Sequence, residues 1–231
     1  MKMIKLLALV VVLPFVTKAQ TKEKPQVKRY FMHSHGISYQ KFDMMNNRIK
    51  MYPQYEQIKN TTGTLQFGII TEKNKTIFNY LVSLGTSLSG DKEKRSTATR
   101  FTGLAFDLGY YLYKGEQFSF YPLVGLGFEN FTLILNRDNS AIPFDSVVNS
   151  SSTRQVVEPL KLANRFITYR LGMGSNITSK SHPRNSFGLQ AGYVGSFKKD
   201  DWRINTTQII SNSPKDKLSK VIVQLLFRYK L

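Results

Sequence analysis

The sequence predicts an all-β fold, an eight-stranded antiparallel up-and-down transmembrane β-barrel. The strongest indication is the last segment, residues 221–231, where every odd position is apolar or aromatic and positions 224, 228 and 230 are polar. A period of two indicates a strand whose two faces meet different surroundings. About 9–11 tilted residues are enough to cross the hydrocarbon layer of a bilayer. The same alternation returns in segment after segment of the chain, and this repetition predicts the barrel.

The beginning of the chain has the layout of a secretory signal peptide. Two lysines precede an apolar run at residues 6–16, and small residues lead to a cleavage site after Ala19. This run is too short to span a membrane as a helix. We therefore expect residues 1–19 to be removed and residues 20–231 to form an outer-membrane barrel domain. No other stretch approaches the length and apolarity of a membrane helix.

The first predicted strand, residues 31–42, is the least regular. Ile37 alternates with small or polar neighbours, but His33 and His35 share its face, so we expect the two histidines at a membrane interface. A second alternating stretch, at 48–55, either extends this strand or replaces it. Seven clearer strands follow, and a single-chain bacterial barrel needs an even number, which is why an eighth is predicted here.

The next hairpin is predicted from residues 64–71 and 76–88, with a turn at 72–75 between them. Apolar side chains occupy alternate positions on both strands, and mostly small or polar residues occupy the other face. The polar stretch 89–99 that follows is predicted to be an exposed loop.

The clearest hairpin joins residues 101–113 to residues 117–135 through a tight turn at 114–116. Both strands alternate over their whole length. Pro122 removes one hydrogen-bond donor from the second strand, so we expect a bulge or a locally unpaired position there.

Two further strands, 165–177 and 186–197, follow a long polar loop at 136–164, and a charged loop at 198–219 leads into the terminal strand. Long and short connections therefore alternate along the chain. In bacterial barrels the short turns are periplasmic and the longer loops are extracellular. The strands are predicted from the alternation of side chains alone, so the pattern of connection lengths supports the topology independently.

The apolar face of these strands is predicted to contact lipid, and the opposite face to line a narrow lumen. The residues predicted to face lipid are Leu104, Phe106, Leu108, Val124, Leu126, Leu171, Leu189, Val223, Leu225 and Phe227. Glycine dominates the opposite face, as expected where inward side chains crowd. A soluble β-sandwich also buries alternate aromatic residues. Its polar face would meet water and carry many charged residues, whereas this one carries few, so the barrel is favoured.

Four charged residues share the predicted inner face: Asp107, Glu129, Arg170 and Arg228. An unpaired charge buried in the lumen would cost several kcal/mol, so we expect these residues to form ion pairs that plug the barrel. The pairing is left open, because Arg228 lies near the periplasmic end. A selectivity ring or a catalytic carboxylate is the functional alternative.

Residues 101–112, 221–231 and 121–131, the last reading Tyr-Pro-Leu-Val-Gly-Leu-Gly-Phe-Glu-Asn-Phe, resemble the small OmpA/OmpX-type outer-membrane barrels, a group that includes PorT-like barrels. The resemblance implies a structural, adhesive or secretion-accessory role, exercised through the extracellular loops. We expect no peptidoglycan-binding domain after the barrel, so the likeness to OmpA is limited to the membrane domain.

Composition narrows the functional classes further. The chain has no cysteine, which excludes thiolate metal sites and cysteine catalysis. Its net charge of +18 is scattered over loops and turns, and export argues against a nucleic-acid partner. The predicted partners are outer-membrane lipids, lipopolysaccharide and an envelope or surface protein.

We expect no cofactor, no metal and no enzymatic activity. Two alternatives stay open. A lipid-modifying enzyme could use His33 or His35 with Ser34, but neighbouring strand positions point to opposite faces. A narrow pore is the other, although the interior of an eight-stranded barrel is filled by side chains.

Overall fold

The computed structural model describes residues 27–91, 94–179, 181, 184–204 and 208–231. The predicted signal peptide, residues 1–19, lies outside the described residues. Among those described, no helix is long and apolar enough to cross a membrane.

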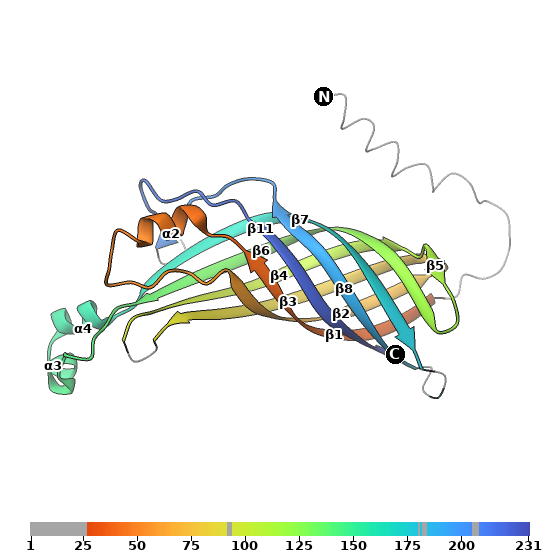
Figure 1. The fold of residues 1–231 in the computed structure, drawn as a ribbon, viewed down its shortest axis with the longest axis horizontal. Helices are drawn as coiled ribbons and strands as arrows, with labels where there is room; N and C mark the ends of the chain where they lie inside the picture. The colour runs from red at the N-terminus through yellow and green to blue at the C-terminus, as the bar shows by residue number, and fades with distance from the viewer. Residues whose placement is uncertain (1–26, 92–93, 180, 182–183, 205–207) are drawn as a thin grey trace, which may run out of the picture.

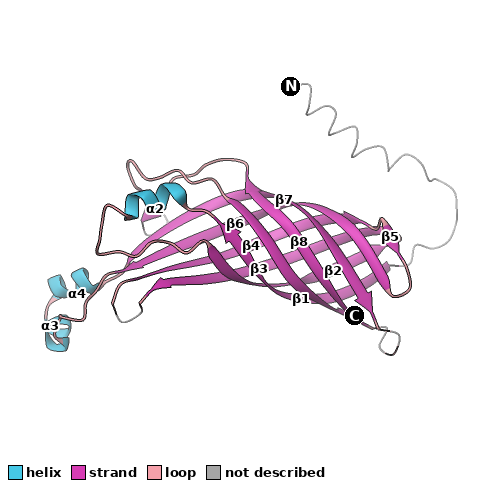
Figure 2. Ribbon diagram, viewed as in Figure 1, coloured by secondary structure: helices cyan, strands magenta, loops and turns pink. Residues whose placement is uncertain are grey.

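The described chain forms a closed antiparallel barrel of eight long strands, as predicted (Figure 2). The long strands are β1 (Val27–Gln40), β2 (Thr61–Lys73), β3 (Thr76–Gly90), β4 (Ser96–Tyr110), β6 (Phe118–Asn136), β7 (Leu160–Thr178), β8 (Asn185–Ser196) and β11 (Ser219–Lys230). Each pairs with its neighbours along the chain, and β11 pairs with β1 to close the barrel. The short elements are β5 (Tyr113–Lys114), β9 (Arg203–Ile204), β10 (Gln208–Ile209), α2 (Asp43–Ile49), α3 (Phe144–Asn149) and α4 (Ser151–Val157).

The two ends of the barrel differ (Figure 1). One end, here called the turn end, holds the C-terminus, the start of β1 and the connections β2–β3, β4–β6 and β7–β8. The other, the loop end, carries all three described helices. The tightest turn is Asn74-Lys75 between β2 and β3, where Asn74 has a φ of 57°. Asparagine tolerates this left-handed conformation better than most residues do.

Several predicted boundaries were wrong, all at the ends of strands. β2 includes Glu72, which was assigned to a turn. The predicted loop at 89–99 shrinks to residues 91–95, because β3 and β4 stay paired as far as Gly90 and Ser96. The predicted loop at 136–164 contains two helices and the first residues of β7, where Leu160 pairs with Leu135.

The alternating stretch at 48–55 is not a strand. It overlaps α2, on which Met45 and Ile49 are buried four residues apart, on one face of a helix. Pro122 behaves as predicted: the β4–β6 ladder ends at Leu123 and resumes only where Phe120 pairs with Tyr113 of β5. The missing donor of Pro122 therefore falls in an interrupted part of the ladder.

Alternation sorts the side chains of the wall as expected. Each of the ten residues predicted to face lipid lies on the outward face of its strand. Eight of them are exposed, at 40–60%, and Leu108 and Phe227 are partly exposed. The outer surface of the barrel is therefore largely apolar.

The inner face is crowded, and glycine makes room for the large side chains. A Cβ at Gly174 would lie 2.6 Å from the ring of Tyr121, which is fully buried in the lumen. A Cβ at Gly125 would overlap the carboxylate of Asp107. The predicted link between glycine and a narrow lumen is therefore seen at these two positions.

Candidate functional site: the filled lumen and the loop end

An ion pair crosses the middle of the lumen. Arg170 on β7 donates from Nε to Oδ1 of Asp107 on β4, at 2.8 Å, and both side chains are buried. The strand between them, β6, contributes Gly125, which is paired with both residues in the strand register. Since Gly125 has no side chain, the carboxylate and the guanidinium meet directly above it. A hollow of about 20 Å³, the size of one water molecule, lies beside the pair.

A second ion pair lies nearer the loop end. Lys220 on β11 donates to Glu129 on β6 at 2.6 Å, and both side chains are almost completely buried. The ammonium of Lys220 also lies 3.8 Å from the ring centre of Phe101. A cation over an aromatic face gains electrostatic stabilisation, particularly in a desolvated site.

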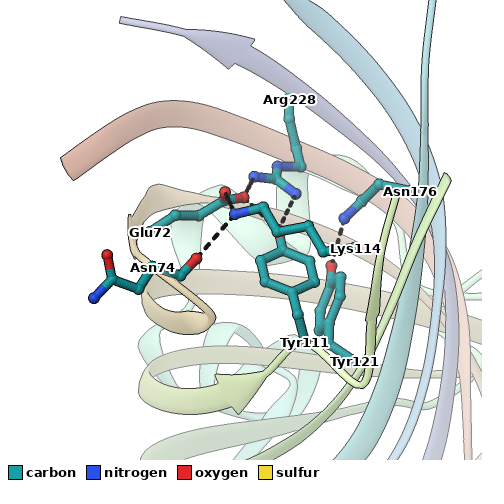
Figure 3. Close-up of polar contacts among 7 residues, drawn as sticks. All are labelled: Glu72, Asn74, Tyr111, Lys114, Tyr121, Asn176 and Arg228. Atoms are coloured by element: carbon teal, nitrogen blue, oxygen red, sulfur yellow. Dashed lines mark hydrogen bonds and ion pairs between the residues drawn. The ribbon is translucent and has the colours of Figure 1, made fainter. Parts of the chain in front are cut away.

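A third cluster closes the turn end (Figure 3). Arg228 on β11 forms a buried ion pair with Glu72 on β2, and the hydroxyl of Tyr111 donates to the same carboxylate. Lys114 contacts the other carboxylate oxygen at 3.1 Å. These four residues come from β2, from β11 and from the connection between β4 and β6, and they meet at the carboxylate of Glu72.

Three further residues complete the third cluster. The amide of Asn176 on β7 contacts the hydroxyl of Tyr121 at 3.1 Å. In the reversed amide orientation, the oxygen of Asn176 lies 2.7 Å from Nη1 of Arg228. The guanidinium also lies 4.3 Å from the ring centre of Tyr30. Hydrogen bonds, ring contacts and the ion pair thus hold Arg228 across the lumen.

The four predicted lumen residues therefore fall into three clusters. Asp107 pairs with Arg170, whereas Glu129 and Arg228 pair with two residues that the sequence analysis did not single out, Lys220 and Glu72. Glu72 was missed because it was placed in a turn. Apolar alternation predicts the terminal strand only from residue 221 onward and so leaves out Lys220, although Lys220 has the same parity as Arg228.

The histidines lie on the outer wall. His33 stacks on Phe227 with ring centres 4.9 Å apart, and its ring lies 5.3 Å from that of His35. Both residues flank Ser34, which is completely buried on the inner side of the wall. The three side chains therefore do not form a base–nucleophile pair. No group of three or more His, Asp or Glu residues suited to hold a metal ion occurs in the part of the chain that the structure describes.

An apolar cluster, here called the cap, fills the barrel at the loop end. It joins inward residues of the strands to α2 and to the β8–β11 loop. Its largest members are Phe42, Phe101, Phe131, Phe166 and Trp202. Trp202 and Phe42 are each 1% exposed. The cap closes the lumen beyond the Glu129–Lys220 pair.

A cleft of about 510 Å³ opens at the outer edge of the cap, here called the cap cleft. Apolar and aromatic residues dominate its lining, with Arg48 and Asn212 among the polar ones. The apolar and aromatic lining residues are Met45, Ile49, Tyr52, Tyr55, Leu135, Leu160, Leu162, Trp202, Ile204, Ile210 and Pro214. Arg48 donates to the backbone oxygen of Asn212 at 3.4 Å, which links α2 to the β8–β11 loop.

Asp216, on the β8–β11 loop, lies against the start of α2. Burial raises the pKa of its carboxyl above the usual value, and nearby Asp43 acts in the same direction. The nearby backbone of Met44 and the indole of Trp202 oppose the rise in pKa without cancelling it. The carboxyl is therefore easier to protonate in the folded cap than in water.

Comparison with solved structures identifies the fold. A major outer membrane protein of Thermus thermophilus aligns with a TM-score of 0.56 at 11% identity, over 89% of this chain and 99% of that chain. Neisserial surface protein A aligns at 0.49 and 8% identity, over 90% and 100%. Ail, the attachment invasion locus protein of Yersinia pestis, in complex with the heparin analogue sucrose octasulfate, aligns at 0.48 and 12% identity, over 89% and 99%.

No protein-family model and no curated protein matches the sequence. The Thermus protein covers nearly the whole chain, so the chain has the fold of an outer-membrane β-barrel. The predicted outer-membrane β-barrel fold is thus confirmed.

Proposed function

We propose that the protein is an integral outer-membrane β-barrel with a closed lumen, which binds an envelope or surface protein through its loop end. In this proposal a cleaved signal peptide directs export, and the membrane partners are outer-membrane lipids and lipopolysaccharide. In this proposal the protein has no enzymatic activity. Its role is structural, adhesive or secretion-accessory, as in the PorT-like group that the sequence resembles.

The apolar outer wall is the observation that carries the membrane assignment. Leu104, Leu126 and Ile167 are 60%, 60% and 68% exposed, and they belong to a continuous series on neighbouring strands. Large apolar patches are rare on soluble monomers. Each square ångström of such surface costs roughly 25 cal/mol in water, and a hydrocarbon layer removes this cost.

The filled lumen argues against transport through the barrel. Three buried ion pairs cross it at different depths, and the cap closes its loop end. Aqueous channels occur in much wider barrels. Each carboxylate of these pairs is held by a cation, which supports a structural role over a catalytic one.

The loop end supports the binding role. Tyrosine and arginine are enriched in protein interfaces, and the cap cleft presents Tyr52, Tyr55 and Arg48 beside an apolar floor. Tyr52 is 51% exposed although it lines this cleft. A protein partner that inserts an apolar side chain beside Tyr52 would complete the burial of this surface.

The test places a photoreactive amino acid at Tyr52, in the cleft, or at Phe106, on the wall, in cells that produce the protein. Illumination should join the Tyr52 variant, and not the Phe106 variant, to one discrete protein. The adduct should disappear when Ile210 in the same cleft is replaced by Glu. An adduct that persists in Ile210→Glu would overturn docking in the cleft.

Two further measurements address the alternatives. The purified protein should produce no conductance steps in planar bilayers, and reproducible steps would establish a pore instead. Lipid A from cells with and without the protein should have the same mass, and a change in acylation would establish an enzyme.

A further inference from the structure

The negative charges on the eight long strands are confined to the lumen side of the wall. The three strand carboxylates, Glu72, Asp107 and Glu129, face the lumen and are paired there. On the outward face near the loop end the charged residues are cations: Arg100, Lys161 and Arg165 are all exposed. At the loop end, the outward faces of the described long strands therefore carry positive charges and no negative charge.

Arg100 borders a hollow of about 650 Å³, here called the basic hollow. Lys94 and Arg137 line it with Arg100, and none of the three forms an ion pair with a described carboxylate. Its remaining lining residues are Leu88, Ser96, Ala98, Ile134, Asn136, Asn139 and Ser140. The neighbouring Asp138 accepts hydrogen bonds from Ser140, and Lys94 helps to lower the pKa of its carboxyl. The hollow thus gathers three cations and several neutral hydrogen-bonding groups.

A second depression starts at the same arginine and runs down the apolar wall. This wall groove, of about 580 Å³, lies over β1 to β4, and Leu65, Leu84 and Gly63 line it together with Arg100. Gly63 faces outward, where a Cβ would meet only the backbone oxygen of Thr86, at 3.7 Å. A larger side chain would therefore fit at this position without disturbing the barrel, and glycine keeps the groove open.

The depth of Arg100 matches that of lipid headgroups. Leu104, on the same outward face, is 60% exposed and belongs to the apolar wall. Arg100 is four residues farther toward the loop end, which corresponds to about 10 Å along the membrane normal for a tilted strand. Since Thr102 and Arg100 follow Leu104 on this face, Arg100 lies past the apolar wall on the side of the loops, where the polar headgroup region adjoins the hydrocarbon layer.

We propose that the basic hollow and the wall groove together bind one phosphorylated, multiply acylated glycolipid of the outer leaflet. Its phosphate lies among Arg100, Lys94 and Arg137, and an acyl chain lies in the groove over Gly63. Guanidinium groups bind phosphate oxygens in a fixed, often bidentate geometry, and lysine adds a compact positive charge. The proposal rests on the proposed membrane insertion and gives the lipopolysaccharide partner a defined site.

The test titrates the full-length barrel in detergent with bisphosphorylated lipid A and counts bound lipid by native mass spectrometry. Arg100→Gln should weaken binding at least tenfold, since it removes charge-assisted hydrogen bonds to the phosphate. Gly63→Leu should weaken it several-fold by filling the groove. Arg29→Gln, which removes an outward cation from the turn end, is the matched control and should bind like wild type.

Inorganic phosphate at the same concentrations should not displace the lipid. If it does, the hollow is a site for free anions and the proposal is wrong. Equal loss in Arg29→Gln, or no adduct with wild type, would also overturn it. Each variant must first migrate faster unheated than boiled on a detergent gel. A wild type without this shift would contradict the membrane proposal itself, whereas a shifted barrel without lipid contradicts only the glycolipid site.

Discussion

Asp107 and Arg170 form an ion pair directly above Gly125, although they lie on strands that do not pair with each other. The glycine in the strand between them makes this contact possible. Three strands therefore take part in this contact. β4 and β7 supply the two charged side chains, and β6 supplies the glycine over which they meet.

Substitution of Gly125 by Ala should break this contact. The new Cβ would overlap the carboxylate of Asp107 and crowd the backbone oxygen of Phe106, 2.6 Å away. Loss of one partner of a buried pair costs about 3–5 kcal/mol, and we expect a loss of this order in the free energy of unfolding from lipid vesicles. Gly63→Ala, at an open outward position, should change the free energy of unfolding little. Equal effects of the two variants would contradict the role of Gly125.

The Glu129–Lys220 pair should show strong coupling between its two residues. Lys220→Met leaves a buried carboxylate without its cation, so this variant should lose several kcal/mol. Glu129→Gln combined with Lys220→Met removes both charges, and the double variant should be more stable than Lys220→Met alone. Denaturant unfolding of the four proteins gives the coupling energy. Additive losses would show that the two side chains do not depend on each other.

A substitution by arginine should lower the free energy of unfolding at the middle of the outer wall and leave it almost unchanged in a loop. We expect Leu126→Arg to cost about 2–4 kcal/mol, the range for arginine near the midplane of a bilayer. Gln155→Arg, on the exposed side of α4, should cost almost nothing. Folding into vesicles followed by denaturant titration measures both. A similar small effect at the two positions would show that water, not lipid, meets Leu126.

The cap should be more stable in mild acid than at neutral pH. The folded pKa of Asp216 is raised above its unfolded value, so the folded cap binds the proton more tightly than the unfolded segment does. Stability is therefore highest at low pH and falls as the pH rises through the region above 3.8, the ordinary value. Trp202 is the only tryptophan of the chain and is buried in the cap, so its fluorescence reports cap opening in urea.

Asp216→Asn provides the control for this pH effect. The variant keeps the size of the side chain and removes its titration, so the urea midpoint reported by Trp202 should no longer change between about pH 4.5 and about pH 7. A pH dependence that survives in Asp216→Asn would assign the effect to other groups.

The long loop between β6 and β7 should be replaceable only in part. A Gly-Ser linker in place of residues 139–157 removes α3 and α4 but leaves both strands intact, so the barrel should still show its faster migration on unheated gels. Replacement of 136–164 removes Leu160 and Leu162, which pair with Leu135 and Leu133 and belong to the cap or pack against it. This larger replacement should destabilise the loop end and shift the Trp202 emission.

The sequence predicts the centre of each strand well and its ends poorly. The two faces of a strand differ in polarity only where one meets apolar surroundings. Beyond the apolar belt the outward residues become polar, as at Arg100 and Arg165, and the alternation fades. The strands nevertheless continue, because backbone pairing persists between β3 and β4 and between β6 and β7.

The fading of alternation at strand ends also explains which site residues the sequence predicts and which it does not. Asp107 and Arg170 lie in the regular centres of their strands, and alternation places both in the lumen. Glu72 and Lys220 lie at strand ends, where a shift of one or two residues in the boundary hides them. The cap was not predicted, because α2 and the β8–β11 loop meet the barrel through contacts between distant parts of the chain.

The cap has a consequence for the order of assembly. Phe42 and Ile58 come from the first connection of the barrel, and Trp202, Leu218 and Ile222 from its last connection and final strand. These side chains come together only after the C-terminal strand has paired with the N-terminal one. When the protein folds into a vesicle, the burial of Trp202, followed by its fluorescence, should thus be the last step of barrel closure. A chain that ends before residue 202 lacks β11 as well, so its loop end would stay open. Such dependence on remote partners is typical of slow folding.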